Sequence, residues 1–169
     1  ENAKIDHKAV IERKNKVVKT LVSGVAMQMK QAKVNVVKAT AKVAGKNPDG
    51  TFNVVANGET YVGKKLLIAS GSNAAVPPIP GLKEALAANI AMTNREILDM
   101  TENISSLIVM GGGVIGLEMA SYFNSVGSKV YVVEMMNNIA GPVDRDISTL
   151  LQKEYAARGV EFILGARVT

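Results

Sequence analysis

Three glycines in the second half of the chain have the spacing of a phosphate-binding turn. Gly111, Gly113 and Gly116 form the pattern G-x-G-x-x-G, between an apolar stretch and a helix-forming stretch. In such a turn the first glycine allows a tight exit from a strand, the second lets a pyrophosphate approach the backbone, and the third lets the helix pack close to the strand. The helix N-terminus adds free N–H groups and a partial positive charge. The pattern predicts a dinucleotide site, although a glycine-rich turn without a ligand would have the same residues.

An acidic residue follows the next apolar stretch and extends this pattern. Glu134 comes directly after residues 129–133, where a carboxylate can accept hydrogen bonds from both hydroxyls of an adenosine ribose. The same carboxylate would repel a 2′-phosphate, and residues 135–137 bring no positive charge beside it. We therefore expect NAD rather than NADP, with an exposed strand-end acid as the plainer alternative. Glu118, near the start of the helix, either complements the helix dipole or reaches the nicotinamide end of the ligand.

The elements that would position this turn alternate between strands and helices. Thr93 and Glu96 have capping-box spacing and predict a short helix through Leu98. Apolar patterning then predicts strands at 107–110, 129–133 and 160–164, and helices at 114–126 and 144–157. This alternation is typical of parallel βαβ units with right-handed crossovers, so we expect an α/β fold with a Rossmann-like parallel sheet.

The first half of the chain has a different pattern. A helix is expected over His7–Gln31, because apolar residues recur there at three- and four-residue steps. The predicted strands lie at 34–37, 41–44, 52–55, 59–62 and 65–69, and the middle three form a small antiparallel β-meander with a tight hairpin at Asn57–Gly58. The proline-rich stretch Val76–Gly81 is the expected linker. His7, the only histidine, is expected to be a solvated surface residue.

Composition excludes several classes of function. The net charge is +5, but the clustered arginines and stacking aromatics of a nucleic-acid site are missing, so we expect no nucleic-acid partner. No apolar run reaches the roughly 20 residues of a membrane span, and no signal peptide opens the chain, which favours a soluble, cytoplasmic protein. With no cysteine, these residues hold no disulfide, thiolate metal site or thiol nucleophile, and we expect no metal. The first residue, which is not Met, and the abrupt end suggest a piece of a longer protein.

Two further motifs resemble a known family. The sequence LLIASGS at Leu66–Ser72, followed by PPIPG at Pro77–Gly81, resembles the flavoprotein pyridine-nucleotide disulfide oxidoreductases when taken together with GGGVIGLE at Gly111–Glu118. The likeness runs over almost the whole chain and is strongest to the dihydrolipoyl dehydrogenases within that superfamily. It implies a glutathione-reductase-like FAD/NAD(P)-binding fold. Residues 1–82 would be the later part of an FAD-binding domain, and residues 83–169 the earlier part of an NAD-binding domain.

The resemblance also implies which residues contact the cofactors. In the family, the loop that matches Ser70, Gly71 and Ser72 contacts FAD, as does the backbone at Ala39. Ser70 replaces the usual threonine of that loop and keeps its hydroxyl. The residues matched to NAD contacts are Gly111, Gly112, Gly113, Val114, Ile115, Gly116, Leu117, Glu118 and Glu134.

The activity implied by the resemblance belongs to a longer enzyme. Dihydrolipoamide would reduce a disulfide, electrons would pass to FAD, and a hydride would pass to NAD, in a homodimer that can belong to a 2-oxo acid dehydrogenase complex. The redox cysteine pair and the His–Glu pair of such enzymes are not among these residues, so we name no catalytic residue and expect the isolated chain to be inactive.

Three alternatives stay open. The parent can be another member of the superfamily, such as an NADH oxidase or a mercuric reductase, or the chain can be a stand-alone NAD-binding module without chemistry. An incomplete parallel sheet also leaves an open edge, so pairing between the two halves, within a chain or across a dimer, is a further hypothesis.

Overall fold

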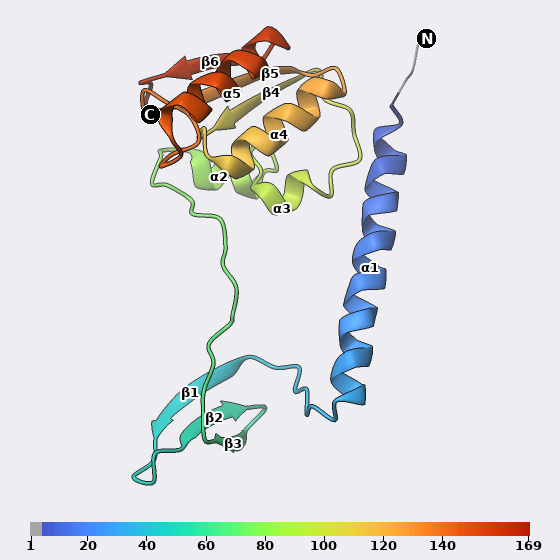
Figure 1. Ribbon diagram of the computed structural model, residues 1–169, viewed down its shortest axis with the longest axis vertical. Helices are drawn as coiled ribbons and strands as arrows, with labels where there is room; N and C mark the ends of the chain where they lie inside the picture. Colours follow the sequence, from blue (N-terminus) through green and yellow to red (C-terminus); the bar gives the residue numbers. More distant parts are fainter. Residues whose placement is uncertain (1–4) are drawn as a thin grey trace. The chain divides into compact units, whose positions relative to one another are not determined.

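The computed structural model describes residues 5–169 and divides the chain into two compact units (Figure 1). The glycine-turn unit contains the residues up to Lys14 together with Ala74–Thr169, and the meander unit contains Asn15–Asn73. In chain order the elements are α1 (His7–Gln31), β1 (Ala41–Lys46), β2 (Phe52–Ala56), β3 (Glu59–Gly63), α2 (Leu82–Ala87), α3 (Asn94–Ile97), β4 (Ser106–Met110), α4 (Val114–Ser125), β5 (Lys129–Glu134), α5 (Arg145–Ala157) and β6 (Glu161–Leu164).

The glycine-turn unit is built on a parallel sheet with the strand order β4-β5-β6. Leu107 lies opposite Val130 in the first pair, and Val132 lies opposite Phe162 in the second. These apolar side chains share one face of the sheet and pack with α4, whose Phe123 is 2% exposed. Figure 1 shows α4 and α5 against the sheet. The expected α/β fold with a parallel sheet is confirmed.

The other face of this sheet is uncovered. Alternate residues of the edge strands point away from the helices, and among them Ile108 is 65% exposed and Ile163 is 46% exposed. The parallel sheet therefore has one buried face and one open face within the described residues, although its strands are apolar on both.

His7 joins the start of α1 to α4, contrary to our expectation that it would be a solvated surface residue. Its side chain is only 2% exposed. Nε2 lies 2.9 Å from the carbonyl oxygen of Met100, and Nδ1 lies 2.7 Å from the hydroxyl oxygen of Tyr122. A carbonyl can only accept, so Nε2–H donates to Met100, and Nδ1 shares a hydrogen bond with the Tyr122 hydroxyl. Burial raises the pKa of the Tyr122 hydroxyl. Sequence neighbours alone did not reveal this pairing, because the two rings lie far apart along the chain.

Two helices of this unit begin with side-chain caps, and the sequence predicted the first of them. At α3, the Thr93 side chain accepts from the backbone N–H of Arg95, and the Thr93 backbone N–H donates to the Glu96 carboxylate at 2.7 Å, which confirms the capping box. At α5, the Asp144 carboxylate accepts from the backbone N–H of Asp146. The short helix α2, which follows the proline-rich stretch directly, was not predicted.

The meander unit contains the expected antiparallel sheet, with the order β1-β2-β3. Asn57 and Gly58 connect β2 to β3 with φ angles of 51° and 79°, the left-handed conformation that a tight hairpin of this kind needs at both positions. The pairing of β1 with β2 shifts between Val43 and Gly45, where a bulge interrupts the ladder. Each sheet of the molecule draws its strands from one unit alone.

Two predicted strands are wrong. Residues 34–37 and 65–69 are irregular, and Leu67 and Ile68 are 88% and 72% exposed. An apolar run becomes a buried strand only when another strand accepts its backbone hydrogen bonds. Neither run has such a partner among the described residues, so their apolar composition alone does not make them strands.

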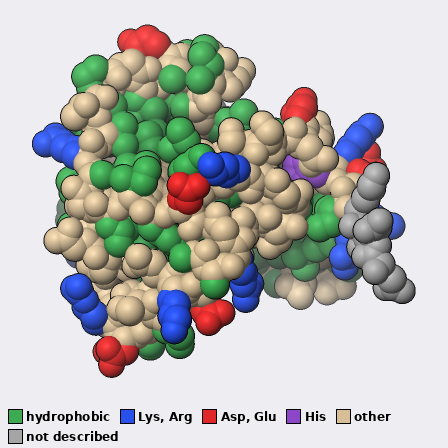
Figure 2. Space-filling model, turned by 90° about the horizontal axis from the view of Figure 1, so that it is seen from above, with side chains coloured by type: hydrophobic (Ala, Val, Ile, Leu, Met, Phe, Trp, Pro, Cys, Tyr) green, Lys and Arg blue, Asp and Glu red, His purple; other side chains and the backbone are tan. Residues whose placement is uncertain are grey.

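No helix within residues 5–169 combines the length and the apolar character that a membrane crossing requires. On the face seen in Figure 2, Lys and Arg side chains are scattered among Asp and Glu side chains and do not gather into one basic patch.

Candidate dinucleotide site

The glycine turn leads the chain from β4 into α4. Gly111 has a φ angle of +107°, which L-residues with a side chain rarely adopt, and its backbone N–H donates to the carbonyl oxygen of Val133 at 2.9 Å. The turn is thereby attached to the neighbouring strand β5 as soon as it leaves β4. The backbone conformation favours glycine at this position, although a Cβ atom there would have no protein atom within 4 Å.

Gly116 and Gly113 differ in the space around them. A Cβ atom added to Gly116 would lie 2.3 Å from the carbonyl oxygen of Gly111 and 3.0 Å from a methyl carbon of Val109. A Cβ atom at Gly113 would have no protein atom within 4 Å. Gly116 thus lets α4 pack tightly on the strand, as the pattern predicts. Gly113 leaves open space beside the turn, and its role toward a ligand stays a prediction.

Glu134 is fixed against this turn. Its Oε2 accepts from the backbone N–H of Gly112 at 2.7 Å, and its Oε1 accepts from the backbone N–H of Met136 at 2.7 Å. A Cβ atom at Gly112 would come within 3.3 Å of the Cβ and Cγ atoms of Glu134. The structure therefore brings together the glycine turn and the acid that the sequence singled out. Each carboxylate oxygen keeps a lone pair with which it can accept a further hydrogen bond from a hydroxyl group.

The N-terminus of α4 carries no side-chain cap. Gly113 is the N-cap, and the first hydrogen bond within the helix runs from the N–H of Leu117 to the carbonyl oxygen of Gly113, at 3.0 Å. The N–H groups of the first turn, from Val114 to Gly116, have no acceptor inside the helix and carry the positive end of its dipole. Leu117 is buried in the core, whereas Val114, Ile115 and Glu118 are exposed.

The loop after β5 holds the turn from its other side. The backbone N–H of Ala140 donates to the carbonyl oxygen of Gly112 at 2.7 Å, and Ala140 has a φ angle of +63°. Ile139 is fully buried, and one of its methyl carbons would lie 3.2 Å from a Cβ atom at Gly112. Gly112 therefore makes hydrogen bonds through both its N–H and its carbonyl group, which leaves its peptide little freedom to rotate.

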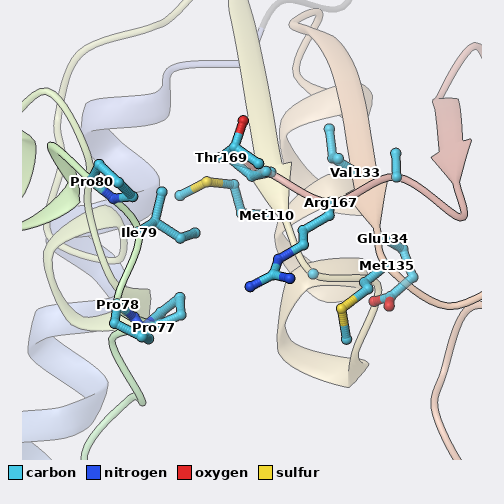
Figure 3. Close-up of a pocket in the computed structure, with 13 residues that line it drawn as sticks. Pro77, Pro78, Ile79, Pro80, Met110, Val133, Glu134, Met135, Arg167 and Thr169 are labelled. Carbon is cyan, nitrogen blue, oxygen red and sulfur yellow. The ribbon is translucent and has the colours of Figure 1, made fainter.

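A cavity of about 550 Å³ lies where the parallel strands end (Figure 3). Of the residues that the sequence singled out, Gly111 and Glu134 line it. The other lining residues are Pro77, Pro78, Ile79, Pro80, Met110, Val133, Met135, Ala166, Arg167, Val168 and Thr169. Ligands of open parallel sheets bind outside the carboxyl ends of the strands, so its position suits a dinucleotide.

Sequence reasoning missed the segment after β6 as part of this cavity. The backbone N–H of Ala166 donates to the carbonyl oxygen of Glu134 at 3.0 Å, which brings Arg167 to the same edge of the sheet. The signal was available, because β5 and β6 are expected to be neighbouring parallel strands whose carboxyl ends meet. The proline-rich stretch, expected to be a linker and counted among the family motifs, also forms one wall of the cavity.

The residues matched to FAD contacts lie in the meander unit. Ala39 and the loop Ser70, Gly71 and Ser72 are exposed and irregular, and Gly71 has a φ angle of +76°. Their assignment to FAD stays a prediction. Within residues 5–169, no group of His, Asp and Glu side chains is arranged to hold a metal ion.

Comparison with known proteins yields a consistent set of relatives. The model of the family "pyridine nucleotide-disulphide oxidoreductase" matches residues 1–169. A dihydrolipoyl dehydrogenase of Acholeplasma laidlawii is 41% identical over 96% of this chain and 47% of its own length, and one of Mycoplasma genitalium is 34% identical over 98% and 35%. The chain thus spans less than half the length of these relatives.

Solved structures agree with this result. The Cu(II) complex of the HOCl-induced flavoprotein disulfide reductase RclA of Escherichia coli matches with a TM-score of 0.81 and 28% identity, over 96% of this chain and 36% of that chain. The Mycobacterium tuberculosis protein LpdA matches with a TM-score of 0.80 at 20% identity, over 98% of this chain and 36% of that chain, which shows the fold alone.

Proposed function

Because the chain belongs to the pyridine nucleotide-disulphide oxidoreductase family, we propose that it is the part of a dihydrolipoyl dehydrogenase that binds NAD. The observation that carries this proposal is the position of Glu134, whose carboxylate is held by hydrogen bonds at the glycine turn and lines the adjacent cavity. A fixed carboxylate beside a helix N-terminus suits a ligand that carries both ribose hydroxyls and a pyrophosphate.

The described residues fit NAD at three points. The open space at Gly113 lets a pyrophosphate approach the backbone, and the uncapped N–H groups of α4 offer it hydrogen bonds. The Glu134 carboxylate accepts from the hydroxyls of the adenosine ribose, and its charge disfavours a 2′-phosphate, so NAD is preferred to NADP. When bound, NAD supplies a nicotinamide ring that accepts a hydride. The task of the protein at this turn is to bind the dinucleotide and fix its orientation.

The other half of the proposal concerns FAD and the domains. Residues 1–82 belong to an FAD-binding domain in which Ser70–Ser72 and the Ala39 backbone contact the flavin cofactor, and residues 83–169 belong to the NAD-binding domain. The family description and the flavoprotein among the solved relatives support a flavin in the intact protein. The exposed apolar side chains of Leu67 and Ile68 agree with a domain that is completed by further residues.

The activity proposed for the whole enzyme is oxidation of dihydrolipoamide by NAD through FAD and a redox disulfide. We propose that the enzyme acts as a cytoplasmic homodimer, with a 2-oxo acid dehydrogenase complex as its partner. The 169 residues alone are expected to have no such activity, because they contain no cysteine. NADH-dependent turnover of lipoamide by the purified chain would contradict this expectation.

Titration of the purified chain with NAD⁺ and NADP⁺ tests the proposed site. We expect NAD⁺ to bind more tightly, and Glu134→Ala to weaken NAD⁺ binding about tenfold, because the variant loses charge-assisted hydrogen bonds to the ribose. The matched control is Glu154→Ala, which removes an exposed carboxylate of α5 that does not line the cavity. Equal affinity of the unsubstituted chain for the two nucleotides would overturn the assigned role of Glu134.

A further inference from the structure

One charged side chain in the cavity has no role in the proposed function. Arg167 follows β6 and lines the cavity that Glu134 also lines. Figure 3 shows its guanidinium directed into the cavity, toward the wall formed by Pro77 and Pro78, whereas the Glu134 carboxylate lies beside the Met135 side chain, farther from that wall. The site therefore presents a cation and an anion from two adjacent segments of backbone.

Arg167 and Glu134 do not form an ion pair with each other. The ion pairs of the described residues join Lys14 to Asp99 and Lys129 to Glu161, and neither includes Arg167. Glu134 makes its hydrogen bonds to backbone N–H groups of Gly112 and Met136 instead. The Arg167 guanidinium therefore keeps its five N–H donors for solvent or for a ligand.

The donor set of an arginine suits one chemical group above others. A planar guanidinium forms two parallel hydrogen bonds to a phosphate or a carboxylate, and it is charged at every physiological pH. Most of the cavity wall around Arg167 is apolar, with Pro77, Met110 and Met135 among its residues. Arg167 itself is exposed, so a ligand can reach its guanidinium from solvent.

The position of Glu134 indicates which phosphate group of a dinucleotide the Arg167 guanidinium would bind. With the adenosine ribose at Glu134, the pyrophosphate of a dinucleotide lies toward the N-terminus of α4, on the side of the glycine turn. A phosphate on the other side, beside the ribose, exists only in NADP, where it is bound to the 2′-oxygen. We infer that Arg167 binds the 2′-phosphate of NADP and gives this site a measurable affinity for that nucleotide, an inference that rests on the proposed function.

In this arrangement two opposing charges set the nucleotide preference. Glu134 favours NAD by accepting from the ribose hydroxyls and by repelling a 2′-phosphate, and Arg167 offsets part of that repulsion. Removal of either side chain changes the ratio of the two affinities, in opposite directions. In a site without the Arg167 contact, removal of the Glu134 side chain would change the ratio of the two affinities, but removal of the Arg167 side chain would not.

The experiment measures the dissociation constants of NAD⁺ and NADP⁺ for the full chain and for Arg167→Ala. We expect the variant to bind NADP⁺ about tenfold more weakly and NAD⁺ within about twofold of the unsubstituted chain, because NAD⁺ has no group at the 2′-position. Arg167→Lys should show an intermediate loss, since it keeps the charge without the planar fork. Glu134→Gln should tighten NADP⁺ binding. Arg158→Ala, at the end of α5 and outside the cavity, is the matched control and should change neither constant.

The possible outcomes separate this inference from the proposed function. Equal weakening of both nucleotides in Arg167→Ala would place the guanidinium on a group that they share and would overturn the inference, as would no change in either. In both cases the NAD site would stand if Glu134→Ala still weakened NAD⁺ binding. Failure of the unsubstituted chain to bind either nucleotide would instead reject the proposed function and the inference together.

Discussion

The glycine-turn unit and the meander unit each contain a three-stranded sheet, but among residues 5–169 only the sheet of the first unit has a buried core beneath helices. In the first unit, Val130 and Val132 of the central strand are fully buried beneath α4. In the meander unit, every residue of β1 is exposed. Ala56 of β2 is the one buried residue in the three strands of that sheet. The two sheets have hydrogen-bonded ladders of similar length, so the difference lies in what covers them.

This difference shows that backbone pairing and core formation are separate requirements. The meander is held by local hairpins, in which neighbouring segments of the chain pair through turns such as Asn57–Gly58. The parallel sheet can form only with crossover helices, and these helices bring the apolar cover with them. Stability in the meander unit should therefore respond weakly to side-chain truncation, and stability in the glycine-turn unit should respond strongly.

Truncation of one phenylalanine in each unit gives the largest expected contrast. Phe123→Ala should lower the free energy of unfolding of the glycine-turn unit by about 4 kcal/mol, because it empties a fully packed site in the core. Phe52→Ala should cost about 1 kcal/mol, since its ring is only half-buried and lies 5.6 Å from the Lys46 ammonium group. Urea denaturation followed by circular dichroism measures both. Similar losses in the two variants would show that the meander unit has a core of comparable quality.

Substitution of two glycines by alanine should separate packing from ligand binding within the glycine-turn unit. Gly116→Ala should cost about 3 kcal/mol of stability, because the new methyl group meets the backbone carbonyl of Gly111, which cannot move aside. Gly113→Ala has open space and a negative φ angle of −74°, so thermal denaturation should leave it near the unsubstituted chain. Its NAD⁺ affinity should fall nonetheless, because the methyl group would occupy the space through which the pyrophosphate is proposed to approach. A stable Gly116→Ala variant would refute the tight helix–strand contact.

The start of α1 allows a smaller comparison, between the buried hydrogen bonds of His7 and the exposed ion pair of Lys14 with Asp99. His7→Ala should cost about 2 kcal/mol, because it leaves the Met100 carbonyl and the Tyr122 hydroxyl without their partner in a buried place. Lys14, also on α1, forms an ion pair with Asp99, and both of those side chains contact solvent, so Lys14→Ala should cost about 0.5 kcal/mol or less. The two variants can be compared by thermal denaturation. Equal costs would mean that the His7 contacts are as weak as a surface pair.

The smallest expected effect is the same in both units. Hydrogen bonds from Thr93, first from its hydroxyl and then from its backbone N–H, lower the pKa of Glu96 below its ordinary value, and Thr51 lowers the pKa of Asp49 in the same way. Each folded-state pKa is depressed, so the stabilising contribution is present above the ordinary pKa and is lost as the pH falls through the folded value. NMR titration of Thr93→Val and Thr51→Val should show both carboxyl pKa values rising. A rise in one unit only would mean that these turns depend on the surrounding core.

Sequence reasoning succeeded where the information was local or periodic. The capping box at Thr93, the hairpin at Asn57–Gly58 and the alternation of strands and helices in the second half all follow from short spacings. It failed at residues 34–37 and 65–69, because an apolar run does not reveal whether a partner strand is present. Glu134 could be predicted beside the turn from its place after a strand.

Other features of the site required three dimensions. His7 and Tyr122 meet across most of the chain, and no spacing rule connects them. Arg167 reaches the cavity through a hydrogen bond between the segments after β5 and β6. The hydrogen bonds that hold the Glu134 carboxylate depend on the path of the glycine turn, which a sequence pattern describes only as a class.

Because Gly116 has no Cβ atom, the close contact between α4 and the turn has a consequence for the energetics of binding. Since α4 sits directly on the turn that precedes it, and the Gly112 peptide makes hydrogen bonds through both its N–H and its carbonyl group, this part of the proposed site is already ordered without a ligand. A ligand that docks there spends little of its binding free energy on ordering the protein. Exchange of one bound ligand for another would then require no refolding of this turn.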